Sequence, residues 1–345
     1  MKEKKDLLIK KFLLLLFCLP LAILFSVSVG SADLSMGESL RLLFSKIPFF
    51  GKWLDCSDLK EVYQIIVFQV RLPRIILAGL VGAGLSLAGA VFQGLFRNPL
   101  ADPHVLGVSS GAAVGATFVI LSGIQIHFLG LGAVGIGAFL GAVVTIFFVY
   151  RIACIRERVP VVNLLLTGTA ISTMLSALIS LMMSLHREGV EKVYMWTLGS
   201  FSSASWTKVG YLAVCLLISA LGFEVLSNDL NLLLTGEDAA ESMGVDLVRL
   251  KKQIVCLASF LVAACVSVSG VIGFVGLIMP HCMRIISGSS YRSLIPFSLA
   301  GGAVFMILCD MMARTVTAPS EIPVGVVTSL IGAPYFIYLI YQNRT

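Results

Sequence analysis

The sequence predicts an all-α, polytopic membrane protein with about ten transmembrane helices. Hydrophobic residues make up 58% of its 345 residues and charged residues only 13%, and the mean hydropathy is +0.97. Soluble domains carry about 25% charged residues. Several stretches also lack Asp, Glu, Lys and Arg over about the 20 residues that a helix needs to cross the hydrocarbon core of a bilayer.

The uncharged runs place the spans one by one. The run from Pro103 to Tyr150 is long enough for two helices, and the run that begins at Gln253 holds one helix and a short second one. No stretch between spans is long enough for a soluble domain, so residues 1–345 form a single membrane domain. In chain order, we expect spans near residues 12–30, 75–96, 107–123, 129–150, 161–184, 209–226, 253–270, 271–285, 293–312 and 324–342.

The N-terminus carries five lysines within its first eleven residues, which predicts a cytoplasmic location because basic residues resist translocation. The apolar core that follows is long and has no A-x-A site after it, so we expect a retained helix and not a cleaved signal peptide. An even number of spans then leaves both termini in the cytoplasm, residues 31–70 outside and residues 228–252 inside. Trp53, Trp196 and Trp206 fall on outer segments, where an aromatic belt is expected.

A polar stretch, RNPLADPH at residues 97–104, interrupts the apolar sequence between the second and third spans. Pro99 and Pro103 lack an amide hydrogen and restrict the residues before them, so one helix ends here and the next begins. The side chains of Asn98 and Asp102 can accept amide hydrogens that the turn leaves free. We therefore predict a tight cytoplasmic turn with a structural role.

Several motifs in series are similar to those of one transporter family. They are RLPR at 71–74, RNPLADP at 97–103, LGVSSGAAVGA at 106–116, WTLGSF at 196–201, LNLLLTGEDAAESMGV at 230–245, GVIGFVGLIMPHCMR at 270–284 and PSEIPVGVVTSLIGAPYFIYLI at 319–340. Together they resemble the permease family of ATP-binding-cassette (ABC) importers for iron-siderophores, haem and vitamin B12. The resemblance covers the chain from Arg71 to Ile340, and it implies the type II ABC importer permease fold.

That fold has two inverted-repeat halves, and an internal echo in the sequence agrees with it. Arg71 and Gly89 are eighteen residues apart, as are Lys252 and Gly270. In the predicted topology the two copies begin on opposite sides of the membrane, as an inverted repeat requires.

The resemblance also implies partners and a location. The chain would work as a homodimer in the bacterial cytoplasmic (inner) membrane, with two ABC ATPase subunits and an external protein that delivers a metal chelate. No nucleic acid is expected. The chain lacks the phosphate-binding motif G-x-x-x-x-G-K-[ST], so it would be a non-catalytic subunit without a cofactor, and ATP and Mg²⁺ would bind the partner ATPase. Siderophore, haem and cobalamin remain open as substrates, because members for each share these motifs.

Two sets of site residues follow from the resemblance at the outer surface and within the spans. Arg71, Arg74 and Arg314 fall at the predicted outer surface, where positive charge is normally depleted, and the resemblance implies that they receive acidic residues of the binding protein. The family's fifth and tenth helices line the route. The resulting candidates for the translocation path are Thr167, Thr169 and Ser172. Their hydroxyl groups could instead only bond the carbonyls of their own helix.

The cytoplasmic loop at residues 228–252 carries the third set. Its segment DAAESMG is similar to the E-A-A-x-x-x-G element of ABC importers, which implies that the ATPase docks here. We expect a short helix whose small methyl groups fit a groove in the ATPase and which Gly244 ends through a left-handed cap. The residues assigned to coupling are Gly236, Glu237, Asp238, Ala239, Ala240 and Gly244.

Other chemistry has less support in the sequence. Residues 107–111 match the G-x-S-x-G motif of serine hydrolases, but that motif needs a strand before its serine. We favour close helix packing by small residues, and we interpret Gly137 and Gly141 in the same way. No metal site is predicted, because the histidines lie in separate segments without a metal-ligand spacing: His104, His127, His186 and His281.

Two other functional classes stay open. An ion-coupled secondary transporter could bind sodium through unwound backbone, although no carboxylate lies in the middle of a predicted span. Asp310 and Arg314 lie near the outer end of the ninth span, at an i, i+4 spacing that suits a local ion pair. An intramembrane serine hydrolase would require a reactive Ser109.

Overall fold

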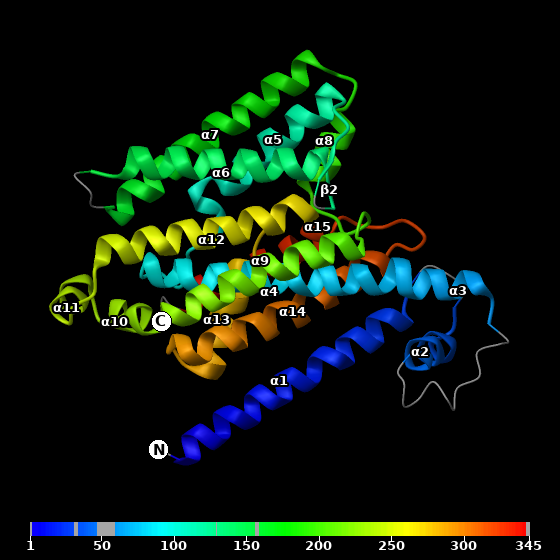
Figure 1. Ribbon diagram of the computed structural model, residues 1–345, viewed down its shortest axis with the longest axis horizontal. Helices are drawn as coiled ribbons and strands as arrows, with labels where there is room; N and C mark the ends of the chain where they lie inside the picture. The colour runs from blue at the N-terminus through cyan, green and yellow to red at the C-terminus, as the bar shows by residue number, and fades with distance from the viewer. Residues whose placement is uncertain (1, 31–33, 47–58, 129, 156–158, 343–345) are drawn as a thin grey trace.

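The chain folds into a bundle of long helices that run roughly side by side (Figure 1). The computed structural model describes residues 2–30, 34–46, 59–128, 130–155 and 159–342. Trp53 lies outside the described residues, as does part of the predicted external segment. The elements are α1 (Lys2–Ser28), α2 (Met36–Ser45), α3 (Glu61–Ile65), the π-helical turn η1 (Ile66–Arg71), α4 (Leu72–Leu95), the 3-10 turn η2 (Pro103–Leu106), α5 (Val108–Ser122), β1 (His127–Phe128), β2 (Leu131–Gly132), α6 (Ala133–Ala153), α7 (Val161–Leu185), α8 (Val190–Thr197), α9 (Trp206–Val225), α10 (Ser227–Leu233), α11 (Glu237–Ser242), α12 (Leu247–Ser269), α13 (Val275–Ser287), α14 (Tyr291–Thr315) and α15 (Val324–Gln342).

The prediction of an all-α protein with about ten spans is confirmed. Within the described chain, eight helices are long and apolar enough to cross a membrane, and the shorter apolar helices α5 and α13 occupy the other two predicted positions. The eighth predicted span is α13, with 13 residues. The second span is longer than predicted, because the helix runs without a break from Glu61 to Leu95.

Helix α4 forms the centre of the bundle, and nearly all of its side chains are buried. It packs against α9, α12, α13 and α14. Gly89 allows α13 to approach closely, because a Cβ at this position would overlap the backbone of Gly276. The crossing therefore requires glycine on both helices.

Helices α5 and α6 pack against each other through small residues. Gly137 and Gly141 of α6 lie against Gly115 and Gly111 of α5, and a side chain at any of these positions would meet the backbone of the opposite helix. The small-residue packing interpretation of this stripe is confirmed. The short strands β1 and β2 join the two helices as an antiparallel pair with His127 opposite Gly132.

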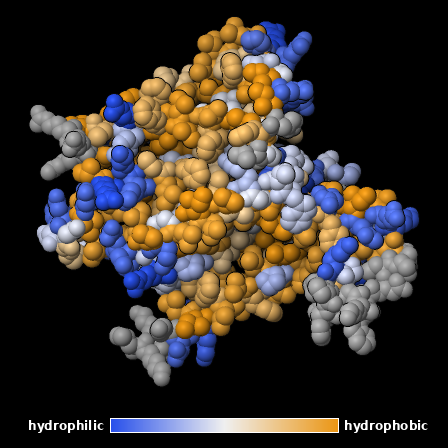
Figure 2. Space-filling view, viewed as in Figure 1, coloured by the Kyte–Doolittle hydropathy of each residue, from blue (hydrophilic) through white to orange (hydrophobic). Residues whose placement is uncertain are grey.

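The periphery of the bundle is apolar, and its ends are polar (Figure 2). One end, here called the α11 end, holds α10, α11, the start of α1 and the beginnings of α7 and α12 (Figure 1). The opposite α8 end holds α2, α3, α8 and the start of α9. Helix α15 begins at the α8 end, where the amide groups of Val324 and Gly325 donate to the carbonyls of Gly199 and Leu198. The apolar belt between the two ends matches the hydrocarbon layer of a membrane.

Candidate functional site

The α8 end contains a cluster of charged side chains from three parts of the chain. Arg74 on α4 donates to both carboxylate oxygens of Asp310 on α14, at 2.9–3.2 Å. It also donates to both oxygens of Glu321, at 2.8 and 2.9 Å. Arg314 lies one turn after Asp310, and its Nε is 3.1 Å from Asp310 Oδ2. The local ion pair anticipated from the i, i+4 spacing is therefore confirmed.

Two of the arginines also hold the end of α1. Arg71 donates to the carbonyl of Val27 at 2.8 Å, and Arg314 donates to the carbonyl and the hydroxyl of Ser26 at 3.2 and 2.7 Å. The last carbonyls of a helix have no partner within the helix and carry partial negative charge, so a cation stabilises them. The cluster thus fixes α1 at the α8 end of the bundle.

The expectation that these arginines face outward at the surface is wrong. Arg71, Arg74 and Arg314 are only 5%, 8% and 6% exposed. Guanidinium groups in this position need acceptors, since an unpaired buried charge is costly. The acceptors are Asp310, which is fully buried, Glu321 and the end of α1. These bonds hold the arginines within the protomer, and a direct contact with a binding protein stays a prediction.

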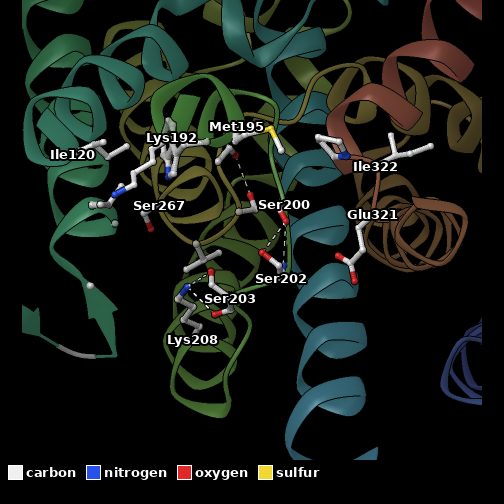
Figure 3. Close-up of a pocket in the computed structure, with 18 residues that line it drawn as sticks. Ile120, Lys192, Met195, Ser200, Ser202, Ser203, Lys208, Ser267, Glu321 and Ile322 are labelled. Atoms are coloured by element: carbon white, nitrogen blue, oxygen red, sulfur yellow. Dashed lines mark hydrogen bonds between the residues drawn. The ribbon is translucent and has the colours of Figure 1, made fainter. Parts of the chain in front are cut away.

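A cavity of about 620 Å³ opens beside the cluster (Figure 3). It lies between α8, the segment that follows α8, the start of α9, the end of α12 and Glu321. Lys192 and Lys208 both line it. The ammonium group of Lys208 donates to the carbonyl and the hydroxyl of Ser203 at 2.9 and 2.7 Å. Sequence reasoning missed this site, because no motif links lysines that lie on different helices.

The three path candidates on α7 do not share one environment. Thr169 is exposed, and its hydroxyl donates to the carbonyl of Leu165 at 2.8 Å. Thr167 is half-buried, and Ser172 is half-buried beside Gly107. Further exposed hydroxyl groups, which were not predicted from the sequence, continue the stripe that Thr169 begins and bond the preceding turn in the same way: Thr173, Ser176 and Ser180.

The turn at residues 97–104 has the predicted local bonds. The Asn98 carboxamide oxygen accepts from the amide of Leu100 at 2.9 Å, and the Asp102 carboxylate accepts from the amide of His104 at 2.8 Å. Pro99 is exposed, whereas Pro103 is buried against Gly276 of α13. The turn therefore starts at the surface of the α11 end and enters the protein interior before α5 begins.

His104 has a structural role that the sequence analysis did not assign. Its Nε2 lies 2.9 Å from the carbonyl oxygen of Ile272, and its Nδ1 is hydrogen-bonded to the hydroxyl of Ser109. The ring therefore ties the turn to the irregular segment between α12 and α13. Ser109 is buried and lies in the first turn of α5, directly after η2. The strand that a hydrolase elbow requires before its serine is replaced by a 3-10 turn.

The coupling residues form a short exposed helix at the α11 end. Helix α11 spans Glu237–Ser242, and Gly244 follows it with a φ of +91°, in the left-handed region that was predicted for its cap. Ala239 is exposed, but Ala240 is completely buried. The expectation that Ala240 offers its methyl group to a partner is therefore wrong, because one residue of helix turns by about 100° and brings Ala240 against the protein interior.

One ion pair anchors this helix to the bundle. The ammonium group of Lys251 on α12 lies 2.7 Å from a carboxylate oxygen of Glu237, and the lysine side chain is 8% exposed. The other coupling residues lie at the surface or close to it, with Gly236 half-buried and Asp238 exposed. Among the described residues, no group of three or more His, Cys, Asp or Glu side chains is arranged to hold a metal ion.

Comparison with known proteins identifies the family of this chain. The model of the FecCD transport family matches residues 16–342. The chain belongs to the FecCD transport family. Among curated relatives, a cobalamin import permease, BtuC, of Halobacterium salinarum is 41% identical over 82% of this chain and 75% of its own length. The molybdate import permease MolB of Haemophilus influenzae is 36% identical, covering 92% and 91%.

A haemin transport permease, HmuU, of Yersinia pestis is 34% identical over 94% of each chain. A solved inward-facing structure of a metal-chelate type ABC transporter superposes with a TM-score of 0.82 at 35% identity, covering 96% of this chain and 99% of the other. This FecCD chain is therefore a membrane-spanning ABC importer permease, as the resemblance implied. The ion-coupled alternative loses its support, because the solved structure that superposes on this chain is an ABC transporter.

Proposed function

We propose that this FecCD permease moves a metal chelate into the cytoplasm: an iron chelate, as a siderophore complex or haem, or cobalamin. Relatives named for cobalamin and haemin and the solved metal-chelate type transporter support this class of substrate. ATP and Mg²⁺ would bind a separate ATPase subunit, since the chain lacks a phosphate-binding loop. The chain itself would then contribute the route and not the catalysis.

The observation that carries the proposal is the hydroxyl-bearing face of α7. Thr169, Thr173, Ser176 and Ser180 follow one another at helical spacing on an exposed face of a spanning helix. Interfaces between transmembrane helices are enriched in Ser, Thr and small residues, whereas a helix face that only contacts lipid has no need of them. We therefore assign this face to the interface with a second copy, with the route between the copies passing Thr167, Thr169 and Ser172.

The two ends of the bundle would take different partners. The α11 end, with both termini, would lie in the cytoplasm, since the lysines in the first eleven residues resist translocation. Exposed residues of α11 would meet the ATPase there. The α8 end would face outward and receive the binding protein, while Arg71, Arg74 and Arg314 would fix the helix ends beneath the docking surface.

Uptake into proteoliposomes tests the proposal. The permease would be purified with its ATPase and binding protein and offered haemin, a ferric siderophore and cyanocobalamin. We expect uptake of one of these that requires ATP and the binding protein. Uptake that follows a sodium gradient without ATP, or that occurs only with molybdate, would contradict the proposal.

A further inference from the structure

We infer that the cavity beside α8 is a binding site for an amphipathic organic anion, such as a metal chelate that carries carboxylate groups. The inference rests on the proposed function, and it narrows the substrate to anionic chelates.

The cavity carries positive charge that the described residues do not neutralise. Lys192 from α8 and Lys208 from α9 approach it from one side in the view of Figure 3, and Glu321 lies on the other. Glu321 could offset one lysine, but both of its oxygens accept from Arg74. Neither lysine has a carboxylate within ion-pair distance among the described residues. An anion that enters would therefore gain the attraction of two ammonium groups.

The two lysines can donate hydrogen bonds to a ligand as well as attract it by charge. Ser203 holds the ammonium group of Lys208 with two hydrogen bonds, and a third N–H is left for a ligand. Lys192 is exposed and has no hydrogen-bond partner among the described residues. One cation is thus fixed in position and the other is free to close on the ligand.

Much of the remaining lining is apolar, beside five serines, and the volume suits an organic molecule. Ile120, Val134, Met195, Trp196 and Ile322 contribute side chains to the cavity. Its volume of about 620 Å³ falls within the roughly 300–1,000 Å³ of small-molecule sites. An inorganic oxyanion would leave this apolar surface uncovered, so the lining favours an anion with a large apolar body.

The cavity also adjoins the proposed route. The segment after α8 forms one wall, and its residues Leu198 and Gly199 accept hydrogen bonds from the first amides of α15. Because α15 is the tenth predicted span, which the family resemblance places along the route, a chelate in this cavity would lie directly beside the outer mouth of the pathway. The site would receive the chelate after release by the binding protein.

Equilibrium binding to the full-length permease in lipid nanodiscs, without ATPase or binding protein, tests the inference. The probes are haemin, which carries two carboxylates, cyanocobalamin, which carries no net charge, and molybdate. We expect haemin to bind most tightly and to weaken as salt rises. Lys192→Gln should weaken haemin binding about fivefold and the Lys192→Gln, Lys208→Gln double variant by roughly 30-fold, because each removes one partly exposed charge pair.

Matched variants separate the site from general effects. Lys60→Gln removes an exposed lysine from the same end of the protein and should leave haemin binding unchanged. Lys208→Arg retains the charge and should bind within about twofold of wild type. Glu321→Gln should bind haemin at least as well as wild type, since it removes the only carboxylate among the described residues that line the cavity.

Three results would overturn the inference. They are wild-type haemin affinity in the double lysine variant, an equal loss in Lys60→Gln, and binding of cyanocobalamin or molybdate as tightly as haemin. None of these results touches ATP-driven uptake, which is measured on the complete complex. A failure of this site is therefore distinguishable from a failure of the proposed function.

Discussion

The two ends of the bundle use their charged residues in opposite ways. At the α8 end, Arg74, Asp310 and Arg314 are buried and join helices that are more than two hundred residues apart in the chain. At the α11 end, the charges of α11 are mostly exposed, and a single ion pair from Lys251 to Glu237 holds the helix. The comparison teaches that charged side chains at a membrane boundary can either join helices within the protein or contact a partner. Whether the side chain is buried or exposed distinguishes these two roles.

Replacement of Asp310 tests the internal role and should have the largest effect. Asp310→Ala leaves Arg74 and Arg314 buried without their shared carboxylate, and the loss of one partner from a buried pair costs about 3–5 kcal/mol. We expect a large fall in the thermal stability of the purified permease. Glu321→Gln is the control, because the side chain of Glu321 is 40% exposed and its loss should cost much less. Equal stability of both variants would show that burial does not distinguish them.

Substitution on α11 tests the partner role. Ala239→Arg places a long side chain on the exposed face of the helix, so we expect normal folding but loss of the ATPase on purification, or ATP hydrolysis without uptake. Ser289→Arg adds the same side chain to the exposed turn between α13 and α14. This variant should retain the ATPase on purification and support ATP-driven uptake. Ala240→Arg should reduce expression instead, because position 240 is buried. If Ala239→Arg co-purifies with the ATPase and supports wild-type uptake, α11 is not the coupling site.

The ion pair at the α11 end should have the smallest effect on stability. Lys251→Met keeps the apolar stem of the side chain and removes the charge that holds Glu237. Because Glu237 is partly solvated, we expect the free energy of unfolding to fall by about 1 kcal/mol or less. We also expect less chelate to be transported for each ATP hydrolysed. Measurements of stability and of uptake per ATP separate these effects. A loss as large as that of Asp310→Ala would remove the contrast between the two ends.

Much of the fold could be read from the sequence where the controlling interaction is local or where a bilayer imposes it. A helix that crosses hydrocarbon must be apolar over its length and satisfy its own backbone, so uncharged runs located the spans. The caps by Asn98 and Asp102 join residues two apart, and the pair of Asp310 with Arg314 joins residues four apart. Such contacts follow from helix and turn geometry alone.

Only the tertiary structure decided which polar side chains are buried. Hydropathy treats a charge near the end of a span as surface, yet Arg74 reaches Asp310 from 236 residues away, and that buried partner makes its burial possible. The same holds for Ala240, whose burial depends on the packing of α11 against the bundle, and for the lysines that α8 and α9 bring to one cavity. Hydropathy measures transfer out of water, but it does not distinguish lipid from protein as the new surroundings.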